Sequence, residues 1–145
     1  MTPIDDGRCF ACGPENEIGL HLHFEPVRDG QVRARTTLAP QYQGWRDIAH
    51  GGIALALLDE AMAHAAGAAG YRGVTASMNA RFRKPVPIGA PLEIEGRVRW
   101  SRRNVLELEA RVLDARGTVL VEGEGRFVSQ GRIGDVTDRR NPANG

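Results

Sequence analysis

The sequence predicts an α+β domain in which a curved antiparallel sheet wraps around one central helix. Residues 53–69 form the longest apolar helical pattern of the chain. From residue 74 to 127, apolar residues alternate with charged ones in runs that short turns separate. Each run is therefore expected to be a strand with one apolar face, and the single helix is the layer that can cover those faces.

Size and charge narrow the classes of function. A chain of 145 residues is about one domain. Its 19 basic and 18 acidic side chains nearly cancel, so no global charge favours nucleic acid or an anionic membrane as a partner. The N-terminus lacks a signal-peptide pattern, and Cys9 and Cys12 are too few for a disulfide scaffold. We expect a cytoplasmic protein with no nucleic-acid or membrane partner.

Two segments precede the helix. Residues 1–19 are rich in Gly, Pro, Asp and Asn, which predicts an irregular N-terminal arm. Alternating residues from Leu20 to Pro26, a turn at residues 28–30 and a second run to Leu38 predict a β-hairpin. Residues 39–49 show no period and are expected to be a loop.

The helix should begin close to Gly51 and end near Gly67–Gly70, where glycine and small residues provide a stop. In the run Leu92–Trp100, the alternation places Trp100 on the apolar face. The domain is expected to span residues 20–129, followed by a mobile tail at 130–145 with few apolar residues. Four strands are expected after the helix: Val74–Phe82, Leu92–Trp100, Leu106–Val112 and Val119–Phe127.

The entrance of the helix is a candidate oxyanion site. His50, Gly51 and Gly52 come directly before the apolar pattern. Glycines without side chains let another group approach the first free N–H donors, which carry the positive end of the helix dipole. His50 could orient a substrate or support the turn as a cap.

Two adjacent carboxylates, Asp59 and Glu60, lie within the helix about 100° apart on a helical wheel. Glu60 shares its stripe with His64, an i,i+4 pair that can satisfy it. Asp59 lies on a stripe of small and apolar residues and needs a partner from a strand, another subunit, water or a ligand. Asp59 is therefore either the functional acid or a buried structural carboxylate.

The rise of the helix constrains how a site could be assembled. Seven residues separate Gly52 from Asp59, which is roughly 10 Å of helix axis. That distance is too long for both groups to act on one carbonyl. Two chains with antiparallel helices would place the entrance of one beside the acid of the other, which predicts a dimer with two shared sites.

At this point the chain resembles the hotdog-fold acyl-CoA thioesterases of the phenylacetate-pathway (PaaI-like) type. The resemblance runs from about Leu20 to Val128 and rests on three features. These are His50-Gly51-Gly52, Asp59 nine residues after the histidine, and the strand ending Asn79-Ala80-Arg81-Phe82-Arg83-Lys84-Pro85. The arm from Cys9 to Leu20 is also similar to that of some relatives. The resemblance implies the hotdog fold.

The resemblance also implies roles for single residues. Asp59 would be the general base or the nucleophile, and the N–H of Gly52 or Gly51 would polarise the thioester carbonyl. A hydroxyl on the following strand would orient the water or the carboxylate. That position is Thr75, with Ser77 expected beside it on the same face. Many relatives hold the water with an Asn six positions before the histidine. Here that position is Gly44, and the preceding Gln43 is the possible substitute.

Basic residues could receive the phosphates of coenzyme A. They lie at one strand end, Arg81, Arg83 and Lys84, and at one turn, Arg102 and Arg103. Asn79, on the same strand, is also expected to contact the substrate. The alternative is an ordinary solvated charged face. Cys9 and Cys12 with His21 and His23 supply only half of a zinc motif, so no metal site is expected.

The sequence therefore predicts an acyl-CoA thioesterase that acts as a homodimer or homotetramer and needs no cofactor beyond the coenzyme A of its substrate. The tetramer is implied by the resemblance alone. Two other readings stay open. One is a hotdog hydratase or dehydratase acting on acyl thioesters, and the other is a protein that binds or senses acyl-CoA without turnover.

Overall fold

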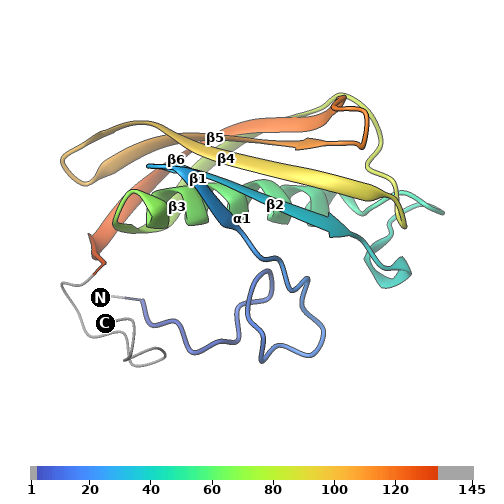
Figure 1. Cartoon of the computed structure of the whole chain (residues 1–145), viewed down its shortest axis with the longest axis horizontal. Coiled ribbons are helices and arrows are strands. Elements are labelled where there is room, and N and C mark those ends of the chain that lie inside the picture. Colours follow the sequence, from blue (N-terminus) through green and yellow to red (C-terminus); the bar gives the residue numbers. More distant parts are fainter. Residues whose placement is uncertain (1–2, 134–145) are drawn as a thin grey trace.

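A six-stranded antiparallel sheet curves around a single long helix in the computed structural model, which describes residues 3–133 (Figure 1). The elements are β1 (Glu25–Arg28), β2 (Gln31–Thr37), η1 (Pro40–Tyr42), α1 (Gly51–Ala68), β3 (Tyr71–Phe82), β4 (Pro91–Arg102), β5 (Val105–Leu113) and β6 (Val119–Arg132). The strand order is β1-β2-β4-β5-β6-β3, so β1 and β3 are the two edges. The predicted architecture and the predicted ends of the helix are confirmed.

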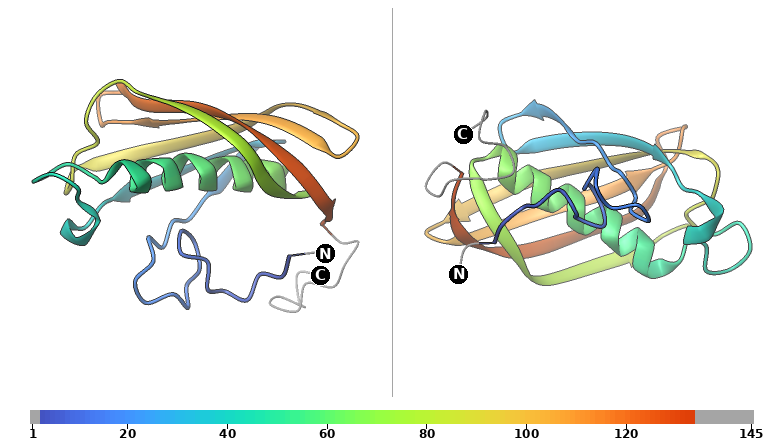
Figure 2. Two further views of the ribbon diagram at one scale, coloured as in Figure 1. Left: turned by 180° about the vertical axis from the view of Figure 1, so that it is seen from behind. Right: turned by 90° about the horizontal axis from the view of Figure 1, so that it is seen from below.

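The core lies between the concave face of the sheet and one face of α1. The largest fully buried side chains come from α1, from the strands and from the residue after β2: Leu38, Leu57, Leu58, Met62, Ile94, Leu106, Leu108, Val112, Val121 and Phe127. The N-terminal arm passes over the side of α1 that faces away from the sheet (Figure 2). The helix is therefore covered on two sides.

Glycines on the inner face of the sheet let the helix approach closely. A Cβ atom at Gly96 of β4 would lie 2.4 Å from the carbonyl oxygen of Ala61, and one at Gly125 of β6 would lie 2.9 Å from the sulfur of Met62. These positions have no room for a side chain. The two glycines thus set how deeply α1 sits in the sheet.

The predicted first strand is wrong in its extent. β1 begins only at Glu25, because the residues before it pair with the arm and not with β2. The N–H groups of Leu20 and Leu22 donate to the carbonyls of Phe10 and Ala11, at 2.8 Å each. His21, between them, has φ of 51°, which breaks the extended alternation expected for this segment.

The expected place of Trp100 on the apolar face is also wrong. The register of β4 shifts between Val98, which opposes Leu108, and Trp100, which opposes Glu107. One extra residue in a strand reverses the alternation beyond it. Trp100 therefore lies on the outer face with 43% exposure, where the guanidinium of Arg126 is 5.8 Å from the centre of its ring.

The sheet extends slightly beyond the expected end of the domain. β6 continues to Arg132, and the next N–H, that of Ile133, donates to the carbonyl of Gly70 at 2.9 Å. Residues 134–145, most of the expected tail, lie outside the described residues. Within the described part of the chain, no helix has the length and apolar character needed to cross a membrane.

Candidate functional site

His50 caps the entrance of α1. Its Nδ1 accepts the N–H of Gly52 at 2.9 Å, and its carbonyl accepts the N–H groups of Ile53 and Ala54 at 2.9 and 3.1 Å. Among the described residues, none accepts the N–H of Gly51. Of the two predicted oxyanion donors, Gly51 is thus the one left open, while Gly52 is engaged by the cap.

The loop before the helix positions this cap. The N–H of His50 donates to the carbonyl of Tyr42 at 2.9 Å, and a Cβ at Gly44 would lie 3.2 Å from the Cα of His50. Only a very small residue fits at position 44. The side-chain oxygen of Gln43 accepts the N–H of Asp47 at 3.3 Å and so stabilises the loop itself. The side-chain amide nitrogen of Gln43 can still donate a hydrogen bond to a water molecule.

Asp59 receives its partner from β3. The hydroxyl of Thr75 donates to Oδ1 of Asp59 at 2.6 Å, across a sequence separation of 16 residues. Asp59 is half-buried on α1, and Thr75 is exposed in the single chain. The hydroxyl orients the carboxylate and leaves Oδ2 of Asp59 available for other chemistry.

Ser77 does not share a face with Thr75, so that expectation is wrong. Thr75 opposes Phe127, whereas Ser77 opposes Arg126, and the register shifts between them. The bulge reverses the alternation of β3 at this point. Thr75 therefore faces the helix and Ser77 faces outward.

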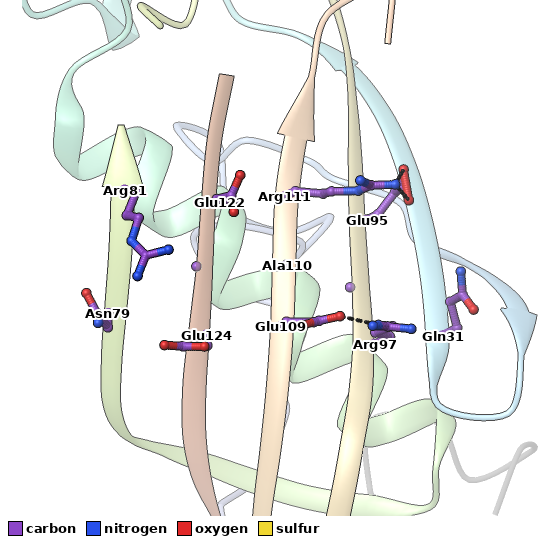
Figure 3. Close-up of a pocket in the computed structure, with 12 residues that line it drawn as sticks. Gln31, Asn79, Arg81, Glu95, Arg97, Glu109, Ala110, Arg111, Glu122 and Glu124 are labelled. Carbon is purple, nitrogen blue, oxygen red and sulfur yellow. Dashed lines mark hydrogen bonds and ion pairs between the residues drawn. The ribbon is translucent and has the colours of Figure 1, made fainter. Parts of the chain in front are cut away.

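Two of the predicted coenzyme A contacts line a hollow on the outer face of the sheet. Asn79 and Arg81 belong to this hollow, which lies on the side of the sheet away from α1 (Figure 3). Its charged side chains are three arginines and four glutamates: Arg81, Arg97, Arg111, Glu95, Glu109, Glu122 and Glu124. An excess of glutamates does not suit phosphate groups, and the sheet separates the hollow from Asp59.

The other two predicted contacts lie past the end of β3. The Nε of Arg83 donates to Glu122 at 2.7 Å, so its charge is already paired. Lys84 is exposed, and among the described residues no carboxylate lies within ion-pair distance of it. Of the three cations Arg81, Arg83 and Lys84, Lys84 is the one best placed to meet a phosphate.

Glu60 stands in different surroundings from Asp59. Its Oε2 lies 3.2 Å from Nε2 of His64 and accepts from the thiol of Cys9 at 3.6 Å. Burial alone would raise the pKa of Glu60, but hydrogen bonds from His64, Cys12 and Cys9 outweigh burial and lower it below its ordinary value. Burial, together with Glu60, raises the pKa of the Cys12 thiol. The predicted Glu60–His64 pair is confirmed.

The approach of the arm to Glu60 is what the sequence did not predict, because 51 residues separate Cys9 from Glu60. His21 and His23, which the sequence offers as possible zinc ligands with the two cysteines, lie elsewhere. Nε2 of His21 lies 2.5 Å from the carbonyl of Asn16, and His23 is exposed. The CxxC pattern was the available signal, but its partner on the helix could not be read from it.

Known proteins resemble the chain in sequence and in structure. The sequence model of the thioesterase superfamily matches residues 47–121. The solved structure of protein RHA08564, a thioesterase superfamily protein, is similar over 83% of this chain, with 32% sequence identity and a TM-score of 0.79. The match covers only 60% of the length of that protein. Among curated proteins, no sequence match was found.

Two further solved structures are similar at lower identity. One is a hypothetical thioesterase from Streptococcus pneumoniae TIGR4 with coenzyme A, at 21% identity and a TM-score of 0.72 over 77% of this chain and 90% of that one. The other is PaaI from the phenylacetic acid degradation operon of E. coli, at 19% identity and a TM-score of 0.72 over 78% and 82%. At these identities the likeness concerns the fold.

Proposed function

We propose that this chain, which belongs to the thioesterase superfamily, hydrolyses acyl-CoA thioesters to a carboxylic acid and coenzyme A. The hydrogen bond from Thr75 to Asp59 carries the proposal, since it holds a half-buried carboxylate in one orientation. The S. pneumoniae protein supports it, having been solved with coenzyme A. The same protein was also solved as two single alanine mutants, one at an aspartate and one at a threonine sixteen positions later. Asp59 and Thr75 of this chain have the same spacing.

A thioester needs little catalytic machinery, because the thiolate of coenzyme A is a good leaving group. As a general base, Asp59 takes a proton from water, the water oxygen attacks the carbonyl carbon, and the carbon–sulfur bond breaks. The proton then passes to the departing thiolate. As a nucleophile, Asp59 would instead form an anhydride that water hydrolyses. In both routes the open N–H of Gly51 stabilises the negative charge on the carbonyl oxygen.

The site we propose is shared by two chains. Gly51 and Asp59 are eight residues apart on one helix, roughly 12 Å along its axis, and so cannot act on one carbonyl. β3 is an edge strand of 12 residues whose Val74 and Phe82 side chains are 46% and 54% exposed. Pairing of β3 with its copy would extend the sheet and bring two antiparallel α1 helices together.

Release of free thiol from a panel of short-chain, long-chain and aryl acyl-CoAs tests the activity. We expect Asp59→Asn to lower kcat/KM about 10²- to 10⁴-fold, the range for loss of a general base. Asp29→Asn, at an exposed turn, is the matched control and should leave the rate unchanged. An unchanged rate in Asp59→Asn would remove the proposed acid, and no release by the wild type would favour a binding protein.

Co-expression of two chains with different catalytic defects tests the shared site. A dimer of one Asp59→Asn chain and one Gly51→Ala chain contains one site with both defects and one site with neither. Random pairing should therefore recover about a quarter of the wild-type activity. Mixed dimers with no recovered activity would show that each chain supplies its own complete site.

A further inference from the structure

Two thiols and a carboxylate converge beside the proposed active helix. The ligand atoms of Cys9, Cys12 and Glu60 all lie within 4.8 Å of one another. Cys9 and Cys12 come from the N-terminal arm, and Glu60 comes from the middle of α1. The cluster therefore joins two segments that are distant in sequence.

The arm is shaped so that both sulfurs reach the helix. The N–H of Gly13 donates to the carbonyl of Cys9 at 2.8 Å and closes a turn around the pair. A Cβ at Gly13 would lie 2.4 Å from the backbone nitrogen of Cys9, so only glycine fits there. Backbone bonds from Leu20 and Leu22 to the same segment fix the turn further.

The carboxylate is held in place from its other side. The side chain of Glu60 is only 12% exposed, and its Oε2 is 3.2 Å from Nε2 of His64. The ring of His64 stacks on that of Phe24, with centroids 4.8 Å apart and planes at 22°. Carboxylates that bind metal ions are usually held in place by a further hydrogen bond, and His64 can provide one to Glu60.

We propose that Cys9, Cys12 and Glu60 bind one zinc-type divalent metal ion that fastens the N-terminal arm to α1. Thiolates select zinc over the harder cations, and two thiolates with one carboxylate leave a fourth tetrahedral position for water. With metal–sulfur bonds of about 2.3 Å, tetrahedral ligands lie about 3.8 Å apart, so donors within 4.8 Å need only small side-chain rotations. The proposal does not depend on thioesterase activity.

Binding of cobalt and zinc to the full chain tests this site without an activity assay. Reduced, chelator-treated protein is titrated with Co²⁺, and thiolate-to-cobalt charge-transfer absorption is followed. Zinc competition then gives the affinity for Zn²⁺, and elemental analysis gives the stoichiometry. We expect one ion per chain, a weaker charge-transfer band in Cys9→Ser and in Cys12→Ser, and an affinity for zinc at least about tenfold lower in Glu60→Gln.

His23→Ala should bind like the wild type, and a loss of binding there would overturn the donor set. Reduced wild type that takes up no zinc or cobalt would overturn the site. An intact mass showing a Cys9–Cys12 disulfide in place of bound metal in freshly isolated protein would do so as well. Should the cysteine variants not fold, the wild type and Glu60→Gln decide the question alone.

Discussion

Thr75 of β3 donates a hydrogen bond of 2.6 Å to Asp59 of α1, while the next residue along the helix, Glu60, contacts the N-terminal arm instead. One turn of helix thus presents two acids to two different parts of the protein. The first faces the exposed edge strand, where a second chain can approach. The second is enclosed by sulfur and imidazole groups.

Removal of the Thr75 hydroxyl should lower activity without unfolding the chain. A hydrogen bond to a charged group is worth about 1.5–3 kcal/mol, so Thr75→Val should reduce kcat about 10- to 100-fold if the bond orients Asp59 for reaction. Thr75→Ser keeps a hydroxyl and should recover most of the rate. Steady-state kinetics with one good acyl-CoA substrate measure both. Equal rates in the valine and serine variants would mean that the bond has no catalytic role.

A methyl group at Gly51 should separate activity from stability. Its Cβ would meet only the ring of Phe82, at 3.8 Å, so Gly51→Ala should fold at least as well as the wild type. The methyl group would crowd the open N–H, and we expect kcat/KM to fall at least about tenfold. Urea unfolding together with thiol release checks this. Full activity in a stable Gly51→Ala variant would argue against this donor.

Gly52→Ala provides the contrast. There the Cβ would lie 3.1 Å from Nδ1 of His50, so the change should disturb the cap and lower the free energy of unfolding by about 1 kcal/mol. If Gly52→Ala and Gly51→Ala were equally stable, the bond from Gly52 to His50 would contribute little to the helix.

Much of the architecture could be predicted because it depends on local periodicity. The helix, the four long strands and the hotdog fold are confirmed, as is the resemblance to PaaI-like thioesterases. Ser77 and Trp100 lie on the opposite faces from those predicted because each follows a bulge, which inserts one residue without leaving a mark in the alternation. The contact of Cys9 with Glu60 depends on tertiary packing, which no local pattern encodes.

The inner-face glycines should tolerate no side chain. A Cβ at Gly96 would lie 2.4 Å from the backbone oxygen of Ala61, so Gly96→Ala must push α1 away from β4. We expect the free energy of unfolding to fall by about 3 kcal/mol or more. Gly67→Ala is the matched control, because its nearest neighbour is Ile133 at 4.0 Å, and it should stabilise the helix by up to about 1 kcal/mol. Similar unfolding midpoints in urea for both variants would contradict this.

Trp100 should contribute little to stability although it is the largest apolar residue of β4. It lies on the outer face with 43% exposure, and the cation–π contact from Arg126 is worth about 1 kcal/mol or less. We therefore expect Trp100→Ala to cost about 1 kcal/mol, against about 2–5 kcal/mol for Leu108→Ala in the core. Equal losses in chemical unfolding would place Trp100 in a buried environment.

Asp114 should make the β5–β6 turn sensitive to acid. Its Oδ1 accepts the N–H groups of Thr118 and Arg116 at 2.9 Å each. The bond from Thr118, helped by that from Arg116, holds the pKa of Asp114 below its ordinary value. A carboxyl whose pKa is lower in the folded state stabilises the protein fully above its unfolded pKa, and this stabilisation is lost as the pH falls through the folded pKa.

Comparison with Asp114→Asn isolates this residue from the other carboxylates, which titrate in both proteins. We expect the wild type to unfold at higher urea concentration than Asp114→Asn at neutral pH. The gap should close as the pH falls below about 4, the region of the ordinary aspartate pKa, because the wild-type side chain then loses its charge. A gap that stayed constant from neutral pH to about pH 2 would mean that the charge of Asp114 does not stabilise the turn.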